Sequence, residues 1–150
     1  MTEYSKIRLR AADDGDFDFA WTIYRTSMEP LTEELLDWHE QDQRNVVKKA
    51  LQASGSSVIT VEEDSVGWLQ VCESADNIYL AQLYVQTDSQ NQGIGSFIVR
   101  HLCDRARRRG KSLTLDIMTN NSARRLNERL GFRPIGRSKY KIEMQWFDDE

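Results

Sequence analysis

The chain has 150 residues, the length of one ordinary domain with room for a hydrophobic core. Its hydrophobic fraction of 39% and its charged fraction of 29% are those of a globular protein, which excludes a disordered or collagen-like chain. The net charge of −4 makes a nucleic acid a poor first expectation, because proteins that bind nucleic acids usually carry a basic face. We therefore expect a single domain over residues 1–150 without a nucleic-acid partner.

No apolar run approaches the length that crosses a bilayer, and the first six residues contain no apolar signal core. These observations predict a cytoplasmic protein without a membrane partner. Cys72 and Cys103 stand far apart, each within an apolar pattern, which predicts two buried free thiols. No metal site is predicted, because the zinc-protease motif that could start at His39 has Gln43 in place of its second ligand.

The first third of the chain predicts one strand and two helices. Residues 7–10 alternate between apolar and polar side chains, as a strand does. Apolar residues then recur at helical spacing over residues 13–26. Pro30 predicts a break in the chain, and Thr32 predicts the cap of a second helix that extends to about residue 52. The polar residues 40–45 make a bend or break within this second helix plausible.

The remaining elements alternate between strands and helices. Residues 58–61 and 66–71 predict a hairpin, and residues 78–85 predict a third strand of this region. A helix from Ile94 ends at Gly110, a strand covers residues 113–117, a short helix ends at Gly131, and a last strand covers residues 140–144. This order predicts an α/β fold with a mixed, mostly antiparallel sheet flanked by helices, and one strand–helix–strand crossover near its end.

The most informative segment joins the strand that ends at Val85 to the helix that begins at Ile94. Its loop ends in Gln90-Asn91-Gln92-Gly93-Ile94-Gly95. Glycine lets backbone N–H groups approach a ligand, and a helix N-terminus adds unpaired donors and a positive dipole end, so the segment favours a phosphate or pyrophosphate. The alternative is that the two glycines only shape a tight turn, and the loop by itself favours that alternative.

Two common nucleotide-binding loops do not fit this segment. The dinucleotide pattern needs a third glycine where this chain has Ile98. The nucleoside-triphosphate loop needs a lysine after its last glycine, where this chain has Ser96. The interpretation that remains is a pyrophosphate cradle without a metal site.

A second motif follows at a fixed spacing. Asn120 is followed by Ala123, and Leu130-Gly131-Phe132 follows a helical stretch. With Gln90-x-x-Gly93-x-Gly95, this motif resembles the acetyl-CoA-binding core of the GNAT superfamily of N-acetyltransferases, without gaps over residues 78–132. The resemblance implies an acetyl-CoA-dependent N-acetyltransferase that uses no metal. It also implies a GNAT-like sheet whose central strands splay apart in a V near Leu83 and Ile117.

The resemblance further implies how acetyl-CoA is held. Backbone groups of Leu83 and Val85 would pair with the pantetheine arm as a missing strand would. Asn120 would hydrogen-bond the same arm, although asparagine is also a frequent helix cap. The backbone N–H groups of the loop would hold the pyrophosphate, which assigns that role to Gln90, Asn91, Gln92, Gly93, Ile94, Gly95 and Ser96.

The chain departs from the family at two catalytic positions. Many members have a tyrosine seven residues after the asparagine, as the acid for the departing thiolate, but this chain has Asn127, which can donate only a hydrogen bond. Where a family glutamate often stands, this chain has Gln82. The candidates for the general base are then Asp116, Tyr84 and Glu29. Asp116 is a candidate because a carboxylate within an apolar strand needs a reason, which could also be exposure at an edge or an arginine partner.

We expect the acceptor to be the primary amine of a small molecule, and the acidic balance favours a cationic one such as a polyamine, an aminoglycoside or a basic amino acid. The substrate wall is predicted within residues 25–45, with Met28, Glu29 and Trp38, although these could equally belong to the core. A homodimer is left open. The rival hypothesis is a non-catalytic acyl-CoA-binding sensor or interaction module, which the two departures from the family support.

Overall fold

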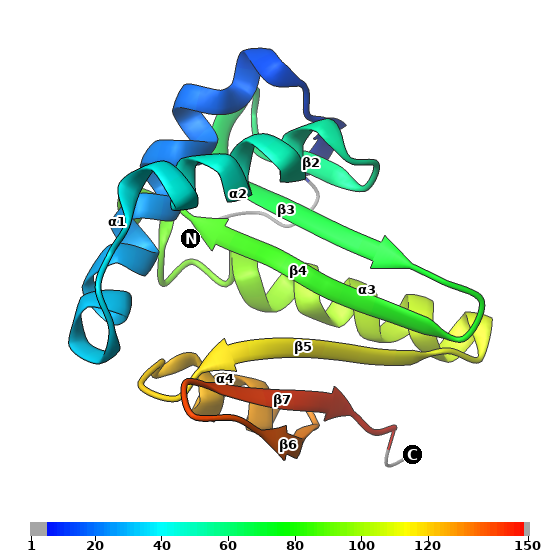
Figure 1. Ribbon diagram of the computed structural model, residues 1–150. Coiled ribbons are helices and arrows are strands. Elements are labelled where there is room, and N and C mark those ends of the chain that lie inside the picture. The colour runs from blue at the N-terminus through cyan, green and yellow to red at the C-terminus, as the bar shows by residue number, and fades with distance from the viewer. Residues whose placement is uncertain (1–5, 149–150) are drawn as a thin grey trace. The chain divides into compact units, whose positions relative to one another are not determined.

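The computed structural model describes residues 6–148, which form a seven-stranded sheet and four α-helices (Figure 1). Neighbouring strands are hydrogen-bonded in the order β1-β2-β3-β4-β5-β7-β6. The β1–β2, β2–β3, β5–β7 and β6–β7 pairs are antiparallel, and β4–β5 is parallel. These pairings confirm the mixed, mostly antiparallel α/β fold. The tertiary contacts divide the chain into unit 1 (Met1–Gln70 and Gln82–Gly95) and unit 2 (Val71–Ala81 and Ser96–Glu150).

Unit 1 contains the predicted first strand and hairpin. β1 (Ile7–Ala11) pairs with β2 (Ser56–Val61), and β2 pairs with the beginning of β3 (Asp64–Glu73). Glu62 and Glu63 join β2 to β3 with φ values of 51° and 77°, the positive values that a two-residue type I′ turn requires.

The helices of unit 1 begin with a capped turn. The Asp13 carboxylate accepts the Gly15 N–H at 2.9 Å, and the Asp16 carboxylate accepts the Asp13 N–H at 3.0 Å, which completes a capping box. A 3-10 turn (Asp14–Asp16) leads into α1 (Phe17–Leu35), and α2 (Glu40–Gln52) follows.

The predicted break at Pro30 is wrong, because α1 continues through this residue to Leu35. Proline removes one helical hydrogen bond, but buried side chains on both sides of it hold the helix. Ile23 and Tyr24 are buried before Pro30, and Thr32 is buried after it, inside α1 and not as a cap of a second helix. The actual break lies at residues 36–39.

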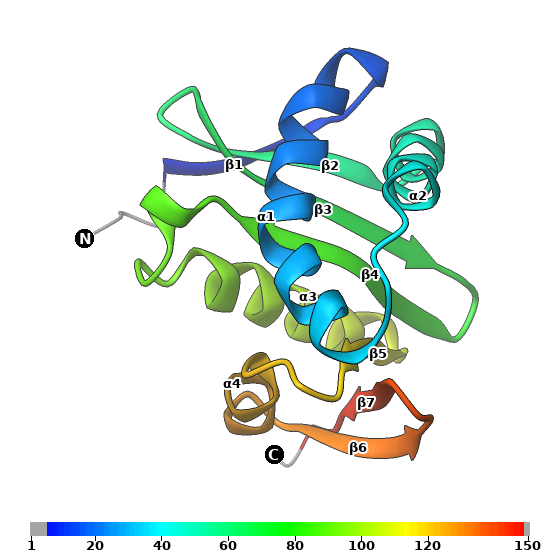
Figure 2. The same cartoon turned by 60° about the vertical axis from the view of Figure 1, so that its left-hand side comes forward.

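Aromatic side chains form the core of unit 1. Trp21 and Tyr24 of α1 and Val47 of α2 pack together with Trp68 of β3, which is 0% exposed. Figure 2 shows α1 crossing in front of β2 and β3, with α2 beside it. The Trp68 indole N–H donates to the Ser56 hydroxyl at 2.7 Å, which satisfies the only polar hydrogen of this ring.

Unit 2 contains most of the predicted crossover and a second antiparallel group of strands, whereas residues 82–95, with the end of the first crossover strand and the start of its helix, belong to unit 1. β4 (Asn77–Val85) pairs in parallel with β5 (Ser112–Met118) from Asn77↔Ser112 to Leu80↔Leu115, and α3 (Ile94–Arg109) connects them along the chain. β7 (Lys141–Trp146) lies between β5 and β6 (Phe132–Arg137), and α4 (Ala123–Arg129) precedes β6. The predicted V-shaped opening near Leu83 and Ile117 remains a prediction.

Three details of unit 2 differ from the sequence analysis. β6 was not predicted, because only Phe132 of its six residues is buried and it contains Pro134. The last strand begins at Lys141, so Tyr140 precedes it. The expectation of two buried thiols is wrong for Cys72, which is exposed near the end of β3, and it is confirmed for Cys103.

Candidate active site

Unit 1 provides the strand end and the loop that the sequence motif predicts. The Gln86 N–H donates to the Val66 carbonyl of β3 at 2.8 Å, and a Cβ atom on Gly67 would stand 2.5 Å from the Tyr84 carbonyl oxygen. The backbone groups of Tyr84 and Gln86 therefore face β3. Because these groups alternate along a strand, those of Leu83 and Val85 face the other edge of β4. That edge is where the pantetheine arm was predicted to pair.

The two glycines of the loop serve different purposes. Asn91 and Gly93 have φ values of 64° and 80°, so Gly93 satisfies a backbone conformation that other residues rarely adopt. Gly95 lies outside this left-handed region, and within the described chain a Cβ atom there would meet nothing within 4 Å beyond its own helix turn. The turn therefore accounts for Gly93 but not for Gly95. An open approach to the first turn of α3 is what binding of an anion at this N-terminus needs.

Buried Ile94 holds the start of this helix, with 2% of its surface exposed. Gln92 and Ser96 flank the glycines, and the Gln90 N–H donates to the Thr87 carbonyl at 3.3 Å, closing a short 3-10 turn (Thr87–Ser89). Residues 90–95 lie in unit 1 and Ser96 lies in unit 2, and their role in holding a pyrophosphate remains a prediction.

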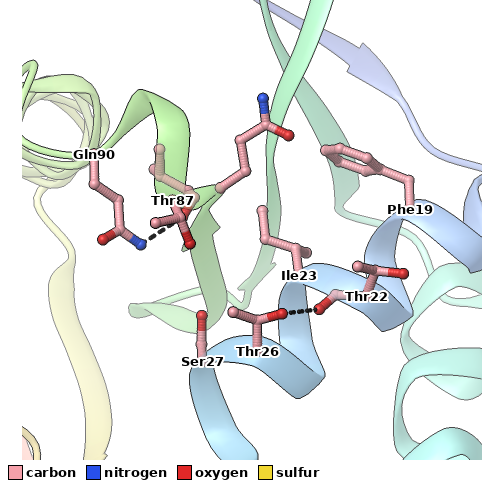
Figure 3. Close-up of a pocket in the computed structure, with 9 residues that line it drawn as sticks. Phe19, Thr22, Ile23, Thr26, Ser27, Thr87 and Gln90 are labelled. Carbon is pink, nitrogen blue, oxygen red and sulfur yellow. Dashed lines mark hydrogen bonds between the residues drawn. The ribbon is translucent and has the colours of Figure 1, made fainter.

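A cavity of about 180 Å³ lies between α1 and the end of β4 in unit 1. Figure 3 shows side chains of Phe19, Thr22, Ile23, Thr26 and Ser27 facing the segment that carries Thr87 and Gln90. The lining contains hydroxyl, amide and apolar groups and no charged side chain. Gln90 Nε2 donates to the Val85 carbonyl oxygen at 2.8 Å beside this cavity, a contact that the sequence pattern did not reveal.

Tyr84, a candidate base, packs into the aromatic core of unit 1. Its ring centre lies 5.5 Å from that of Tyr24 and 5.9 Å from that of Trp68. Its hydroxyl donates to the Gln82 amide oxygen at 2.7 Å. The amide of Gln82 cannot take a proton from this hydroxyl as a carboxylate could, so Gln82 does not activate Tyr84 as a base.

Unit 2 carries Asp116, the second candidate base, on the exposed side of β5. Asp116 Oδ2 accepts the Tyr79 hydroxyl at 2.8 Å, and no ion pair with Lys or Arg is found for it within residues 6–148. Burial first, and then the hydrogen bond to Asp116, raise the pKa of Tyr79 above its ordinary value. β5 is an inner strand of the sheet, so the carboxylate is exposed on a face and not at an edge.

The two asparagines of the second motif also lie in unit 2. Asn127 of α4 is only 7% exposed, and within residues 6–148 its side-chain amide forms no hydrogen bond. Before α4, Asn121 Oδ1 accepts the Ala123 N–H at 2.8 Å, whereas the N-cap residue Ser122 forms no side-chain cap hydrogen bond. The Asn127 amide atoms are not fully enclosed, so the small exposed part of this side chain keeps them in contact with solvent.

The predicted substrate wall lies along α1 and the segment after it. Met28 and Trp38 pack against the core cluster, with the Trp38 ring 6.1 Å from that of Trp21. Glu29, which was also a candidate base, pairs with Arg25 at 3.4 Å. The core alternative thus accounts for Met28 and Trp38, and a role in substrate binding remains a prediction for all three.

Comparisons with known proteins decide the family. The family model for the acetyltransferase (GNAT) family matches residues 17–132. The chain belongs to the GNAT acetyltransferase family. Among curated protein sequences, no significant match was found.

Solved structures of GNAT enzymes share this fold. PaiA N-acetyltransferase from Thermoplasma acidophilum, in complex with coenzyme A, is 13% identical with a TM-score of 0.73, over 93% of this chain and 98% of that chain. The ribosomal-protein-S18-alanine N-acetyltransferase from Escherichia coli is 19% identical with a TM-score of 0.69, over 93% and 92%. Arabidopsis thaliana Naa50, in complex with the bisubstrate analogue CoA-Ac-MVNAL, is 16% identical with a TM-score of 0.66, over 95% and 99%.

No group of three or more His, Cys, Asp or Glu side chains that could hold a metal ion occurs in residues 6–148. No helix in this part of the chain combines the length and the hydrophobicity that crossing a bilayer requires.

Proposed function

We propose that the whole chain is one N-acetyltransferase domain that moves the acetyl group of acetyl-CoA to the primary amine of a small cationic molecule. Membership of the GNAT family supports acetyl transfer. The observation that carries the assignment of the co-substrate is the first turn of α3, where Gly95 meets open space and the fold itself gives no reason for a glycine. Close approach of a pyrophosphate gives that reason.

The residues of this chain would bind and orient the reactants. Leu83 and Val85 offer backbone groups to the pantetheine arm, and Asn120 adds a side-chain amide. In the reaction, the amine nitrogen forms a bond to the thioester carbonyl carbon, the carbon–sulfur bond breaks to release the thiolate of coenzyme A, and the proton lost by the amine passes to water or to that thiolate. Positioning and hydrogen-bond donors near the carbonyl oxygen and the sulfur can supply most of this catalysis, since a thiolate with a conjugate-acid pKa of about 8.5 leaves readily.

The charge distribution favours a cationic acceptor. Unit 1 carries 15 acidic against 7 basic residues, a net charge of −8, whereas the whole chain has −4. Between Thr26 and Gln43 there are six acidic residues and no Lys or Arg. Arg25 pairs with Glu29 and Glu40 of this group. The excess of negative charge would attract a protonated amine and raise its rate of encounter.

Thiol release from acetyl-CoA, measured against a panel of amines, tests the proposal. The panel contains polyamines, aminoglycosides, basic amino acids and short peptides, with an otherwise identical reaction without acceptor as the background. Thiol release above background with a cationic small molecule would support the proposal, and release only with peptides would assign a different acceptor class. An accompanying calorimetric titration identifies a sensor, which binds acetyl-CoA but releases no thiol with any amine.

The sensor hypothesis keeps one specific observation in its favour. Gln82 holds the Tyr84 hydroxyl, and neither group is a base at neutral pH. A chain that only binds acyl-CoA needs no base. The thiol-release assay decides between the two, because binding alone produces no free thiol.

A further inference from the structure

A side chain of the loop occupies one of the backbone groups at the edge of β4. Gln90 Nε2 donates to the Val85 carbonyl oxygen at 2.8 Å, along the dashed line that leaves Gln90 in Figure 3. Under the proposed function, this carbonyl is an acceptor for an amide N–H of the pantetheine arm. The ligand-free chain therefore satisfies this group with its own amide.

This contact gives a hydrogen-bond donor to a backbone carbonyl at the end of β4. A backbone carbonyl without a strand partner needs a donor from a side chain or from water. The loop returns Gln90 to the end of β4 through the short 3-10 turn, so its amide is the donor at hand. The Gln90 side chain is exposed, and exposed hydrogen bonds exchange easily with other donors.

The adjacent cavity offers a second place for the same amide. Gln90 and Val85 both line it, opposite Thr22 and Ser27 of α1. The hydroxyl groups of Ser27 and Thr87 form no hydrogen bond within the described chain. The volume of about 180 Å³ is several times the ~30 Å³ share of one water molecule, so a displaced carboxamide fits there.

We propose that Gln90 is an exchangeable plug, whose amide caps the Val85 carbonyl in the ligand-free protein and moves into the hydroxyl-lined cavity when the pantetheine arm takes its place. The inference rests on the proposed function, because it assumes that the arm pairs with β4. It assigns Gln90 a role separate from that of the backbone N–H groups that hold the pyrophosphate. The Gln90 amide should therefore affect binding of the pantetheine arm, which competes for the Val85 carbonyl, and not binding of the nucleotide.

Gln90→Met tests the plug, because methionine keeps the length of the side chain and removes its donor. Gln86→Met is the matched control, since Gln86 lines the same cavity and its side-chain amide makes no bond to Val85 within residues 6–148. Calorimetry uses two probes: S-acetylpantetheine, which has the arm without the nucleotide, and 3′-phosphoadenosine 5′-diphosphate, which has the nucleotide without the arm.

Gln90→Met is expected to bind S-acetylpantetheine about 2- to 10-fold more tightly than the wild type, the range that the loss of one competing neutral hydrogen bond allows. Its affinity for the nucleotide probe should stay within about twofold, and Gln86→Met should change neither affinity by more than that. Weaker binding of S-acetylpantetheine by Gln90→Met would show that Gln90 holds the arm and overturn the plug. Equal changes for both probes would place Gln90 in the phosphate loop and also overturn it. If the wild type binds neither probe, the proposed function itself fails.

Discussion

Asn127→Leu should make the protein more stable and the enzyme slower. The wild-type amide is 7% exposed and has no side-chain hydrogen bond within residues 6–148. Burying an amide without a partner costs about 1–3 kcal/mol in protein mutational data, and the Asn127 amide should fall at the low end of this range because it keeps some contact with solvent. Leucine has the same branching without polar atoms, and it is larger, so part of this gain will be lost to crowding. We expect the free energy of unfolding to rise by about 1 kcal/mol and Tm by about 2–4 °C.

The opposite effect is expected on turnover, because the same amide is a candidate donor to the departing sulfur. One neutral hydrogen bond contributes about 0.5–1.5 kcal/mol, so kcat should fall by roughly a factor of 2 to 10. Thermal unfolding and steady-state thiol release, measured on one preparation with a confirmed acceptor amine, give the two quantities together. The kcat value should fall more than KM changes, since the donor acts on the leaving group.

Asn121→Ala is the matched control in the same region. The Asn121 amide oxygen accepts the Ala123 N–H at the start of α4, so its loss should lower stability by about 1 kcal/mol and leave kcat unchanged. If Asn127→Leu melts at a lower temperature and turns over as fast as the wild type, Asn127 is a packing residue and the reasoning is refuted. A loss of several orders of magnitude would also contradict it, because one hydrogen bond cannot account for that effect.

Three further predictions concern the loop, the second motif and the cysteines. Gly95→Glu should fold with an unchanged Tm and lose more than about tenfold in acetyl-CoA affinity by calorimetry, because the side chain fits there but its negative charge repels phosphate. Gly93→Glu should lose affinity and also stability, because Gly93 has a positive φ. Equal losses of Tm in the two variants would contradict this distinction. Asn120→Ala should weaken acetyl-CoA binding by about 1–3 kcal/mol, and a large drop in Tm without loss of affinity would assign Asn120 to the fold alone. Burial raises the pKa of the Cys103 thiol to about 12, so a thiol reagent at pH 8 should modify only Cys72 in the native protein. Fast modification of both thiols in the native protein would refute the burial of Cys103.

The sequence predicted the parts of the fold where local pattern and local structure agree. From residue 78 to residue 110, a strand of continuous apolar character, a polar loop and an amphipathic helix follow one another, and each ends at a residue with a clear signal such as Gly110. The loop glycines could be recognised for the same reason. Residues close in sequence form this segment, so its geometry needs no knowledge of distant contacts.

The missed features depend on tertiary contacts. Pro30 predicts a helix end from local rules, but the burial of Thr32 beyond it keeps α1 intact. β6 is an outer strand, where Pro134 costs no hydrogen bond inside the sheet and polar residues face water, so it shows no apolar alternation. Its one neighbouring strand, β7, stabilises it through Trp146 opposite Phe132.

In the candidate site, too, features set by local sequence could be predicted and features set by tertiary contacts could not. The backbone roles of Leu83 and Val85 could be expected from the motif, and the orientation of the β4 backbone agrees with them. The side-chain bond of Gln90 to the Val85 carbonyl and that of Tyr79 to Asp116 could not be expected. Tyr79 and Asp116 are far apart in sequence, and no spacing rule connects them.

The difference between Gly67 and Gly95 has a consequence for the evolution of this chain. Gly67 faces the Tyr84 carbonyl so closely that any side chain must displace the backbone, so selection for folding alone preserves it. Gly95 has room for a side chain, so under the proposed function only selection for binding would keep a glycine there. A descendant that kept the fold but abandoned acyl-CoA would retain the first glycine and accumulate substitutions at the second. In a mutational library selected first for folding and then for activity, the two positions should become intolerant at different steps.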